Sequence, residues 1–171
     1  AYFNNGKLQY RNRWIRTHAW EQEDAAGASL YRGIMDTLKG RDDQPLKNSA
    51  NTDIVGHAGK AVASWYQSGE PYWIDPLTLQ TLGRAPYAGL GGGFSAHCKV
   101  DEHTGEMMFF DYCNNAPYMS YGVIDNAGNQ VLLLPVSVPG PRLPHDMAIT
   151  QHFSILHDLP LIHCEEALKH G

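Results

Sequence analysis

The chain has 171 residues, with 13 Lys and Arg against 18 Asp and Glu, so its formal net charge is −5. An acidic chain without basic clusters is a poor partner for a phosphate backbone, which argues against nucleic-acid binding. Its 43% hydrophobic and 11% aromatic residues are enough for a packed core and exclude wholesale disorder. No apolar run reaches the roughly 18–20 residues of a membrane span, so we expect no transmembrane segment.

The N-terminal part of the chain predicts one strand and one helix. Residues 8–17 are rich in aromatic and β-branched side chains, which favour a strand, and residues 4–6 predict a tight turn before it. Residues 20–26 predict a short helix, and residues 39–45 predict a polar loop.

From residue 51 onward, short strand-like segments alternate with turn signals. The turn signals lie at 57–59, 68–71, 75–76, 101–105, 114–117 and 126–128. Strands at spacings of roughly 8–12 residues indicate a sandwich, a barrel or a propeller. The charged fraction of 18%, against about 25% in an average globular protein, also favours sheet over long solvated helices.

A repeat distinguishes among these all-β architectures. Gly59 and Gly105 precede similar strand segments with an offset of 105 − 59 = 46, and the Pro-Tyr pairs at 71–72 and 117–118 have the same offset. Each unit is a turn glycine, a strand, a Pro-Tyr turn and a further strand, which is the anatomy of one propeller blade. A third unit begins near Ala148.

The chain is too short to close such a propeller. Propellers generally have at least about four blades, whereas these units account for about two to three. The chain also begins at Ala1 rather than at Met and shows no signal peptide. We therefore expect residues 1–171 to form a partial propeller domain, all-β with a short helical insertion near its N-terminus, truncated on its C-terminal side.

Two of the nine histidines are candidates for metal ligands. His97 and His145 are 145 − 97 = 48 residues apart, close to the repeat, and 46 residues before His97 stands Asn51 at the start of the preceding unit. If the innermost strand of each blade starts there, these side chains point towards the axis, where neutral imidazoles can hold divalent iron, copper or zinc. The alternative is that each is an ordinary hydrogen-bonded strand residue. Open catalytic sites generally have at least three ligands, so the others are expected outside this chain.

The cysteines, a glycine-rich stretch and His57 do not predict a further catalytic or binding site. Cys98, Cys113 and Cys164 are too scattered for a disulfide framework or a CxxC metal site, and they indicate reduced thiols in a cytoplasmic protein. Residues 89–93 are glycine-rich, but without a following helix and lysine they predict an inter-blade connection rather than a phosphate-binding loop. His57 lies in a hairpin turn and is expected to be solvent-exposed.

A set of motifs in a fixed order spans nearly the whole chain. The motifs lie at 10–17, 51–52, 71–83, 94–101 and 145–150. This set resembles the carotenoid cleavage oxygenases, the family that includes apocarotenoid and lignostilbene dioxygenases and the retinal pigment epithelium isomerase. The resemblance implies a seven-bladed propeller with a ferrous iron on its axis, held by four histidines.

Carried onto this chain, the resemblance makes His97 the first iron ligand and His145 the second. It implies no catalytic residue beyond the metal ligands and no other cofactor-binding residue. The implied enzyme is a dioxygenase that splits one conjugated C=C bond of a carotenoid or apocarotenoid into two carbonyl products. Its partners are dioxygen and a hydrophobic polyene or stilbene, and peripheral contact with a membrane is left open.

Four positions depart from the family's pattern. Cys98 follows the first ligand, where proline is common, and its thiol is either an extra ligand or a buried small residue. Met147 replaces a usual phenylalanine. Tyr66 stands where relatives carry an acidic residue that accepts a hydrogen bond from a ligand histidine, a supporting position that tunes the metal. Trp65 replaces the lysine of stilbene-cleaving relatives, which favours a carotenoid-like polyene.

Several alternatives remain open from the sequence. Trp65, Phe94 and Tyr118 are candidate walls of the substrate site, or else residues of the propeller core. A lignostilbene-type dioxygenase is an alternative activity. The change at Tyr66 also leaves open an isomerase, or an inactive binding propeller of the same fold. In each case we expect the isolated 171-residue chain to be catalytically inactive.

Overall fold

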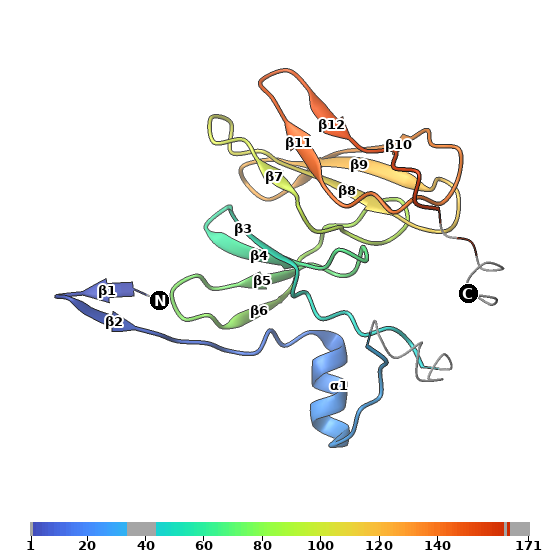
Figure 1. Cartoon of the computed structure of the whole chain (residues 1–171). Coiled ribbons are helices and arrows are strands. Elements are labelled where there is room, and N and C mark those ends of the chain that lie inside the picture. The colour runs from blue at the N-terminus through green and yellow to red at the C-terminus, as the bar shows by residue number, and fades with distance from the viewer. Residues whose placement is uncertain (1, 34–43, 163, 165–171) are drawn as a thin grey trace.

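The structure, a computed structural model, describes residues 2–33, 44–162 and 164. Its elements are, in chain order, β1 (Tyr2–Asn4), β2 (Lys7–Gln9), α1 (His18–Ala26), β3 (Asp53–His57), β4 (Lys60–Ser64), β5 (Tyr72–Ile74), β6 (Thr81–Arg84), β7 (Lys99–Val100), β8 (Met107–Tyr112), β9 (Met119–Ile124), β10 (Gln130–Val136), β11 (Met147–Ile149) and β12 (Ser154–Leu156). Strands dominate the described residues, as the sequence predicts, and α1 lies near the N-terminus (Figure 1). The predicted polar loop at 39–45 lies almost wholly outside the described residues.

Two four-stranded antiparallel sheets form the body of the chain (Figure 1). The first has the strand order β3-β4-β5-β6 and the second β10-β9-β8-β7, so each strand pairs with its neighbour in sequence. The β3–β4 and β7–β8 hairpins turn at Gly59 and Gly105, which both have φ 74°, a left-handed conformation that glycine adopts readily. The two sheets are therefore copies of one blade, and the repeat predicted from the sequence is confirmed.

A third sheet begins where the sequence places a third unit. β11 contains Ala148 and pairs antiparallel with β12, in a register that joins Met147 to Leu156 and Ile149 to Ser154. The first strands of the three units, β3, β7 and β11, lie next to one another in this order (Figure 1). Strands that begin each unit thus gather along one line, as they do around the axis of a propeller.

Hydrophobic side chains fill the spaces between successive sheets. Val62 of β4 and Phe109 of β8 are fully buried members of one cluster, in which Phe109 stacks on Phe94 with ring centroids 4.7 Å apart. The next residue of β8, Phe110, faces the other way and packs against Met147 of β11, because side chains alternate along a strand. A fully buried side chain of this size contributes about 1.5–3 kcal/mol, so packing between sheets holds each blade on the next.

The strand predicted over residues 8–17 is mostly wrong. β2 pairs with β1 and ends at Gln9, and residues 10–17 run on without a strand partner among the described residues. Side chains hold this segment instead: Arg13 Nε donates to the carbonyl oxygen of Thr78 at 3.0 Å, and Thr81 Oγ1 accepts the backbone N–H of Arg16 at 3.0 Å. Strand-forming residues need a neighbouring edge to pair with, and single side-chain bonds do not form a ladder.

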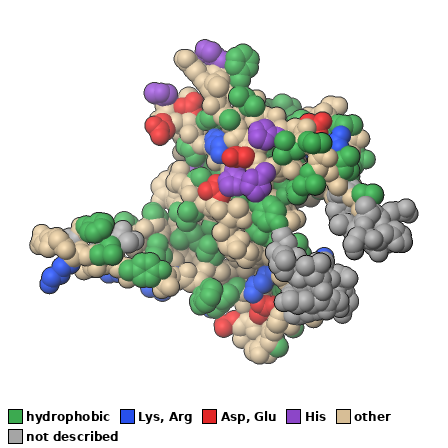
Figure 2. Space-filling view, viewed as in Figure 1, with side chains coloured by type: hydrophobic (Ala, Val, Ile, Leu, Met, Phe, Trp, Pro, Cys, Tyr) green, Lys and Arg blue, Asp and Glu red, His purple; other side chains and the backbone are tan. Residues whose placement is uncertain are grey.

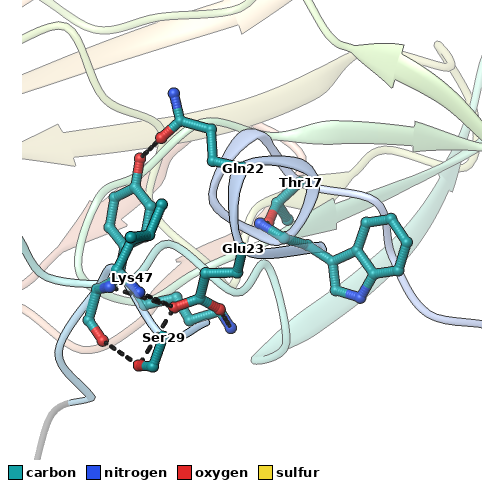
Figure 3. Close-up of polar contacts among 8 residues, drawn as sticks. Thr17, Gln22, Glu23, Ser29 and Lys47 are labelled. Atoms are coloured by element: carbon teal, nitrogen blue, oxygen red, sulfur yellow. Dashed lines mark hydrogen bonds and ion pairs between the residues drawn. The ribbon is translucent and has the colours of Figure 1, made fainter. Parts of the chain in front are cut away.

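The predicted helix at 20–26 is confirmed and begins two residues earlier. Thr17 caps it, because its side-chain oxygen accepts the N–H of Trp20 at 3.2 Å (Figure 3). Gly27 ends it with φ 61°. Glu23 then ties the helix to the segment before β3 through an ion pair with Lys47 (Figure 3). The hydrogen bond from Lys47 lowers the pKa of Glu23. Desolvation acts in the opposite direction, and hydrogen bonds from backbone N–H groups add to the lowering. No helix among the described residues is long and apolar enough to cross a membrane.

Candidate metal centre

His97 and His145 occupy equivalent places in consecutive units. Each stands two residues before the first strand of its unit, since β7 begins at Lys99 and β11 at Met147. The corresponding residue of the first unit is Asn51, two residues before β3. Because β3, β7 and β11 lie side by side, the segments that enter them converge on one line.

The two histidine rings lie against each other. Their centroids are 5.1 Å apart and their planes are inclined by 47°. Two imidazoles bound to one ion at about 2.1 Å have ring centres about 4.6–5.3 Å apart when the angle at the ion is about 90–110°. The observed separation therefore fits two ligands of one ion. Figure 2 shows histidine side chains gathered near the centre of this face, beside acidic side chains.

The backbone of His97 is held by a carboxylate from the preceding unit. His97 has φ 67°, a left-handed conformation that is uncommon for a residue other than glycine. Asp53, the first residue of β3, accepts the backbone N–H of His97 at 3.0 Å, and the same carboxylate oxygen lies 3.8 Å from His97 Nδ1. The side chains of both residues are 25% exposed. A carboxylate beside one ring nitrogen leaves the other, Nε2, as the nitrogen that can bind a metal.

The segment that carries His145 is fixed from both sides. Pro144 before it and Met147 after it are buried, whereas His145 itself is exposed. Asp146 accepts hydrogen bonds from Lys99 Nζ and from the backbone N–H of Met147, both at 2.7 Å. Desolvation acts against ionisation of Asp146, but these hydrogen bonds prevail and lower its pKa, so the carboxylate is ionised next to His145.

The aromatic rings of Tyr66 and Trp65 follow the His145 ring, each next to the one before. The Tyr66 ring centroid is 6.1 Å from that of His145, and the Trp65 centroid is 6.3 Å from that of Tyr66. The structure thus brings Tyr66 beside a predicted ligand. Its phenol oxygen, however, accepts a hydrogen bond from Gln67 Nε2 at 2.7 Å. Trp65 is 8% exposed and lies mostly inside the fold.

Three other predicted residues lie in different surroundings. Phe94 is fully buried and stacks on Phe109, which is the core position that the sequence left as the alternative to a substrate wall. Tyr118 is half-buried, one residue before β9. Cys98 is buried in the same core cluster as Phe94, and desolvation raises the pKa of its thiol to about 12. A neutral thiol in an apolar core is the second of the two alternatives for Cys98.

Two predictions about loops have different outcomes. His57 was expected to be exposed, but it is 6% exposed and its Nε2 lies 3.0 Å from the carbonyl oxygen of Gly105 in the next unit, so that expectation is wrong. The glycine-rich residues 89–93 do form a connection, between β6 and β7, and pack on the buried carboxylate of Asp111, which accepts the N–H of Gly91 at 2.7 Å.

Two residues near the histidines were not predicted. Asp53 and Lys99 line an open groove of about 490 Å³ together with His97 and Ile149. The repeat itself contains the signal that could have found them, since 99 − 53 = 46 and each residue stands two places after Asn51 or His97. Within the described part of the chain, no three or more His, Cys, Asp or Glu side chains are arranged to hold a metal ion.

Stacked antiparallel blades whose first strands meet on one line define the chain as part of a β-propeller. The family model of the retinal pigment epithelial membrane protein (RPE65) matches residues 1–170, and the chain belongs to this family of carotenoid cleavage oxygenases. The carotenoid 9,10(9′,10′)-cleavage dioxygenase 1 of Pisum sativum is 36% identical over 179 residues, which cover 92% of this chain and 33% of the pea protein.

Two solved structures resemble the chain in fold. The lignostilbene dioxygenase of Pseudomonas brassicacearum superposes with a TM-score of 0.78 and 26% identity over 99% of this chain and 36% of its own. The cobalt-substituted apocarotenoid oxygenase of Synechocystis superposes with a TM-score of 0.65 and 26% identity over 84% of this chain and 33% of its own. The chain spans about a third of the length of these relatives.

Proposed function

We propose that the full-length protein carrying this chain is a non-haem ferrous dioxygenase that cleaves a conjugated C=C bond of a carotenoid or apocarotenoid. Dioxygen and the polyene are its substrates, and each of the two carbonyl products receives one oxygen atom. In this proposal residues 1–171 are part of a seven-bladed propeller domain that continues on the C-terminal side, and His97 and His145 supply two of four histidine ligands.

The separation of the two rings carries this proposal. Centroids 5.1 Å apart, at equivalent positions of consecutive blades, match two imidazoles that share one ion. Neutral nitrogen donors suit ferrous iron and leave it with its full charge. When bound, a ferrous ion supplies the redox chemistry that activates dioxygen. The relatives named above are a carotenoid dioxygenase, a lignostilbene dioxygenase and a cobalt-substituted apocarotenoid oxygenase, which supports both the reaction type and a metal centre.

The residues of this chain would hold the metal ion and orient the substrate, and they would not transfer protons. His97 and His145 would act as metal ligands. Asp53 accepts the backbone N–H of His97, and Asp146 accepts the N–H of Met147 in the segment that carries His145. Trp65 and Tyr66 extend the aromatic row from His145, and a polyene lying along them would be kept from water. Tyr118 remains a candidate for the same wall, whereas the buried Phe94 supports it from the core.

A lignostilbene-type substrate is the second candidate. The structural likeness to the lignostilbene dioxygenase extends over 99% of the chain and favours it. Trp65 favours the polyene, because it replaces the lysine of stilbene-cleaving relatives. A side-by-side assay of the full-length protein with an apocarotenoid and a hydroxylated stilbene separates the two candidates. Faster turnover of the polyene supports the proposal, and turnover of the stilbene alone contradicts the substrate assignment.

Metal analysis and labelled oxygen test the reaction. The purified full-length protein should contain about one iron per chain, and His97→Ala should remove it. With ¹⁸O₂, label should appear in both aldehyde products. Aldehydes without label would contradict dioxygenation, and an isomerised substrate would favour the isomerase. No turnover together with iron that persists in His97→Ala would favour the binding propeller. The isolated 171-residue chain should show no turnover, and cytoplasmic location and contact with a membrane surface stay predictions.

A further inference from the structure

In two successive units, the side chain of the first residue of the innermost strand contacts the following unit. Asp53 begins β3 and Lys99 begins β7, 99 − 53 = 46 residues later. Each carries a charged side chain that reaches into the following unit. Asp53 accepts the backbone N–H of His97, and Lys99 donates to Asp146, the residue after His145. Each contact therefore ends on a segment that carries a predicted metal ligand.

Both oxygens of the Asp53 carboxylate are engaged. Oδ1 accepts the N–H of Ile54 at 2.8 Å, which fixes the side chain against its own strand. Oδ2 accepts the N–H of His97 at 3.0 Å and lies 3.8 Å from His97 Nδ1. His97 has the uncommon φ of 67°, and an external partner for its N–H helps to hold the residue in this conformation.

The Lys99–Asp146 pair is well directed but solvent-exposed. The distance from Lys99 Nζ to Asp146 Oδ1 is 2.7 Å. The same oxygen accepts the backbone N–H of Met147, and this second bond orients the carboxylate independently of Lys99. The two side chains are 33% and 45% exposed. An ion pair this exposed adds little to folding stability. Its effect is to join the unit that carries His97 to the segment that carries His145.

We propose that Asp53 and Lys99 are positioning residues that set the separation of His97 and His145 across the blade boundaries. The proposal rests on the proposed metal centre and adds the residues that shape it. At the third unit the equivalent residue is Met147, which is buried in the core, so within the described residues the arrangement comprises these two contacts. Residues that hydrogen-bond to metal ligands typically change metal affinity about 10–100-fold when removed. Asp53 contacts His97 itself, whereas Lys99 acts through Asp146, so we expect the larger effect from Asp53.

A cobalt titration of the metal-free full-length protein tests this role. The visible absorption of bound Co²⁺ reports both affinity and ligand geometry, and it requires no turnover. The variants are Asp53→Ala, Lys99→Met, which keeps the apolar stem, and Lys99→Arg, which can still donate to Asp146. The matched control is Asp75→Ala, since Asp75 also accepts two backbone N–H groups at 2.8 Å but does so in the β5–β6 turn. Circular dichroism and the unfolding midpoint of each metal-free variant are measured alongside.

Asp53→Ala should weaken Co²⁺ binding about 10-fold and Lys99→Met about 3-fold, and both should alter the absorption bands. Lys99→Arg should restore most of the affinity, and Asp75→Ala should bind Co²⁺ like the unmodified protein. If both variants bind with unchanged affinity and spectrum while His97→Ala does not bind, the positioning role is overturned and the metal centre stands. If the unmodified protein binds no Co²⁺, or His97→Ala binds it equally well, the metal centre and this proposal both fail.

Discussion

Replacement of Gly93 by alanine is expected to damage the connection between β6 and β7, four residues before His97. A Cβ atom on Gly93 would lie 2.1 Å from the carbonyl oxygen of Ser68, a backbone atom that cannot rotate away. The two segments must separate by more than about 1 Å to restore an ordinary contact of 3.4 Å. That movement strains the adjoining hydrogen bond from Phe94 N–H to the carbonyl oxygen of Gly69, 2.9 Å long, and the bond from Ser68 Oγ to Asp111.

The size of the effect follows from these contacts. Overpacking costs about 1–3 kcal/mol, and each weakened hydrogen bond adds about 1 kcal/mol. We expect Gly93→Ala to lower the free energy of unfolding of the full-length protein by about 3–5 kcal/mol, measured by urea denaturation. Gly56→Ala is the matched control, because nothing lies within 4 Å of a Cβ at this exposed position of β3. Equal stability of the two variants would refute the reasoning.

Three further predictions concern single side chains. Because the pKa of Glu23 is lowered, its carboxylate stabilises the fold above the ordinary pKa of 4.5, and this stabilisation is lost as the pH falls through the pKa of the folded state. The difference in free energy of unfolding between the unmodified protein and Glu23→Gln should therefore shrink in acid. Urea denaturation curves in which this difference grows would contradict the prediction. Cys98 is 2% exposed with a pKa raised to about 12, so mass spectrometry should find it unalkylated by iodoacetamide until the protein unfolds, whereas rapid labelling of the folded protein would exclude the core position. Tyr66→Glu should strengthen Co²⁺ binding about 10-fold by giving His145 a carboxylate partner; an unchanged or weaker affinity would show that Tyr66 does not stand in the supporting position.

The repeat could be predicted because each blade begins with the same local chemistry. The β3–β4 and β7–β8 turns both need a left-handed residue, which explains Gly59 and Gly105 at equal places. The spacing of His97 and His145 then follows, since both precede the first strand of a unit by two residues. Local turn chemistry and strand spacing were sufficient for these inferences.

The parts that the sequence did not predict depend on contacts between distant residues. Residues 10–17 have strand-forming side chains, but among the described residues they contact Thr78 of the β5–β6 turn and the side chain of Thr81 at the start of β6 instead of pairing with a strand edge. His57 looks like a turn residue, yet Gly105 of the next unit covers it. Asp53 and Lys99 appear as ordinary charged strand residues until β3, β7 and the segment before β11 lie together.

An anomalous diffraction experiment can locate the proposed iron site. Crystals of the full-length protein, measured at the iron absorption edge, should show one anomalous peak on the propeller axis. We expect this peak about 2.1 Å from a ring nitrogen of both His97 and His145. An iron peak elsewhere in the molecule, or rings of these two histidines turned to solvent with no peak between them, would show that the two histidines do not share a metal ion.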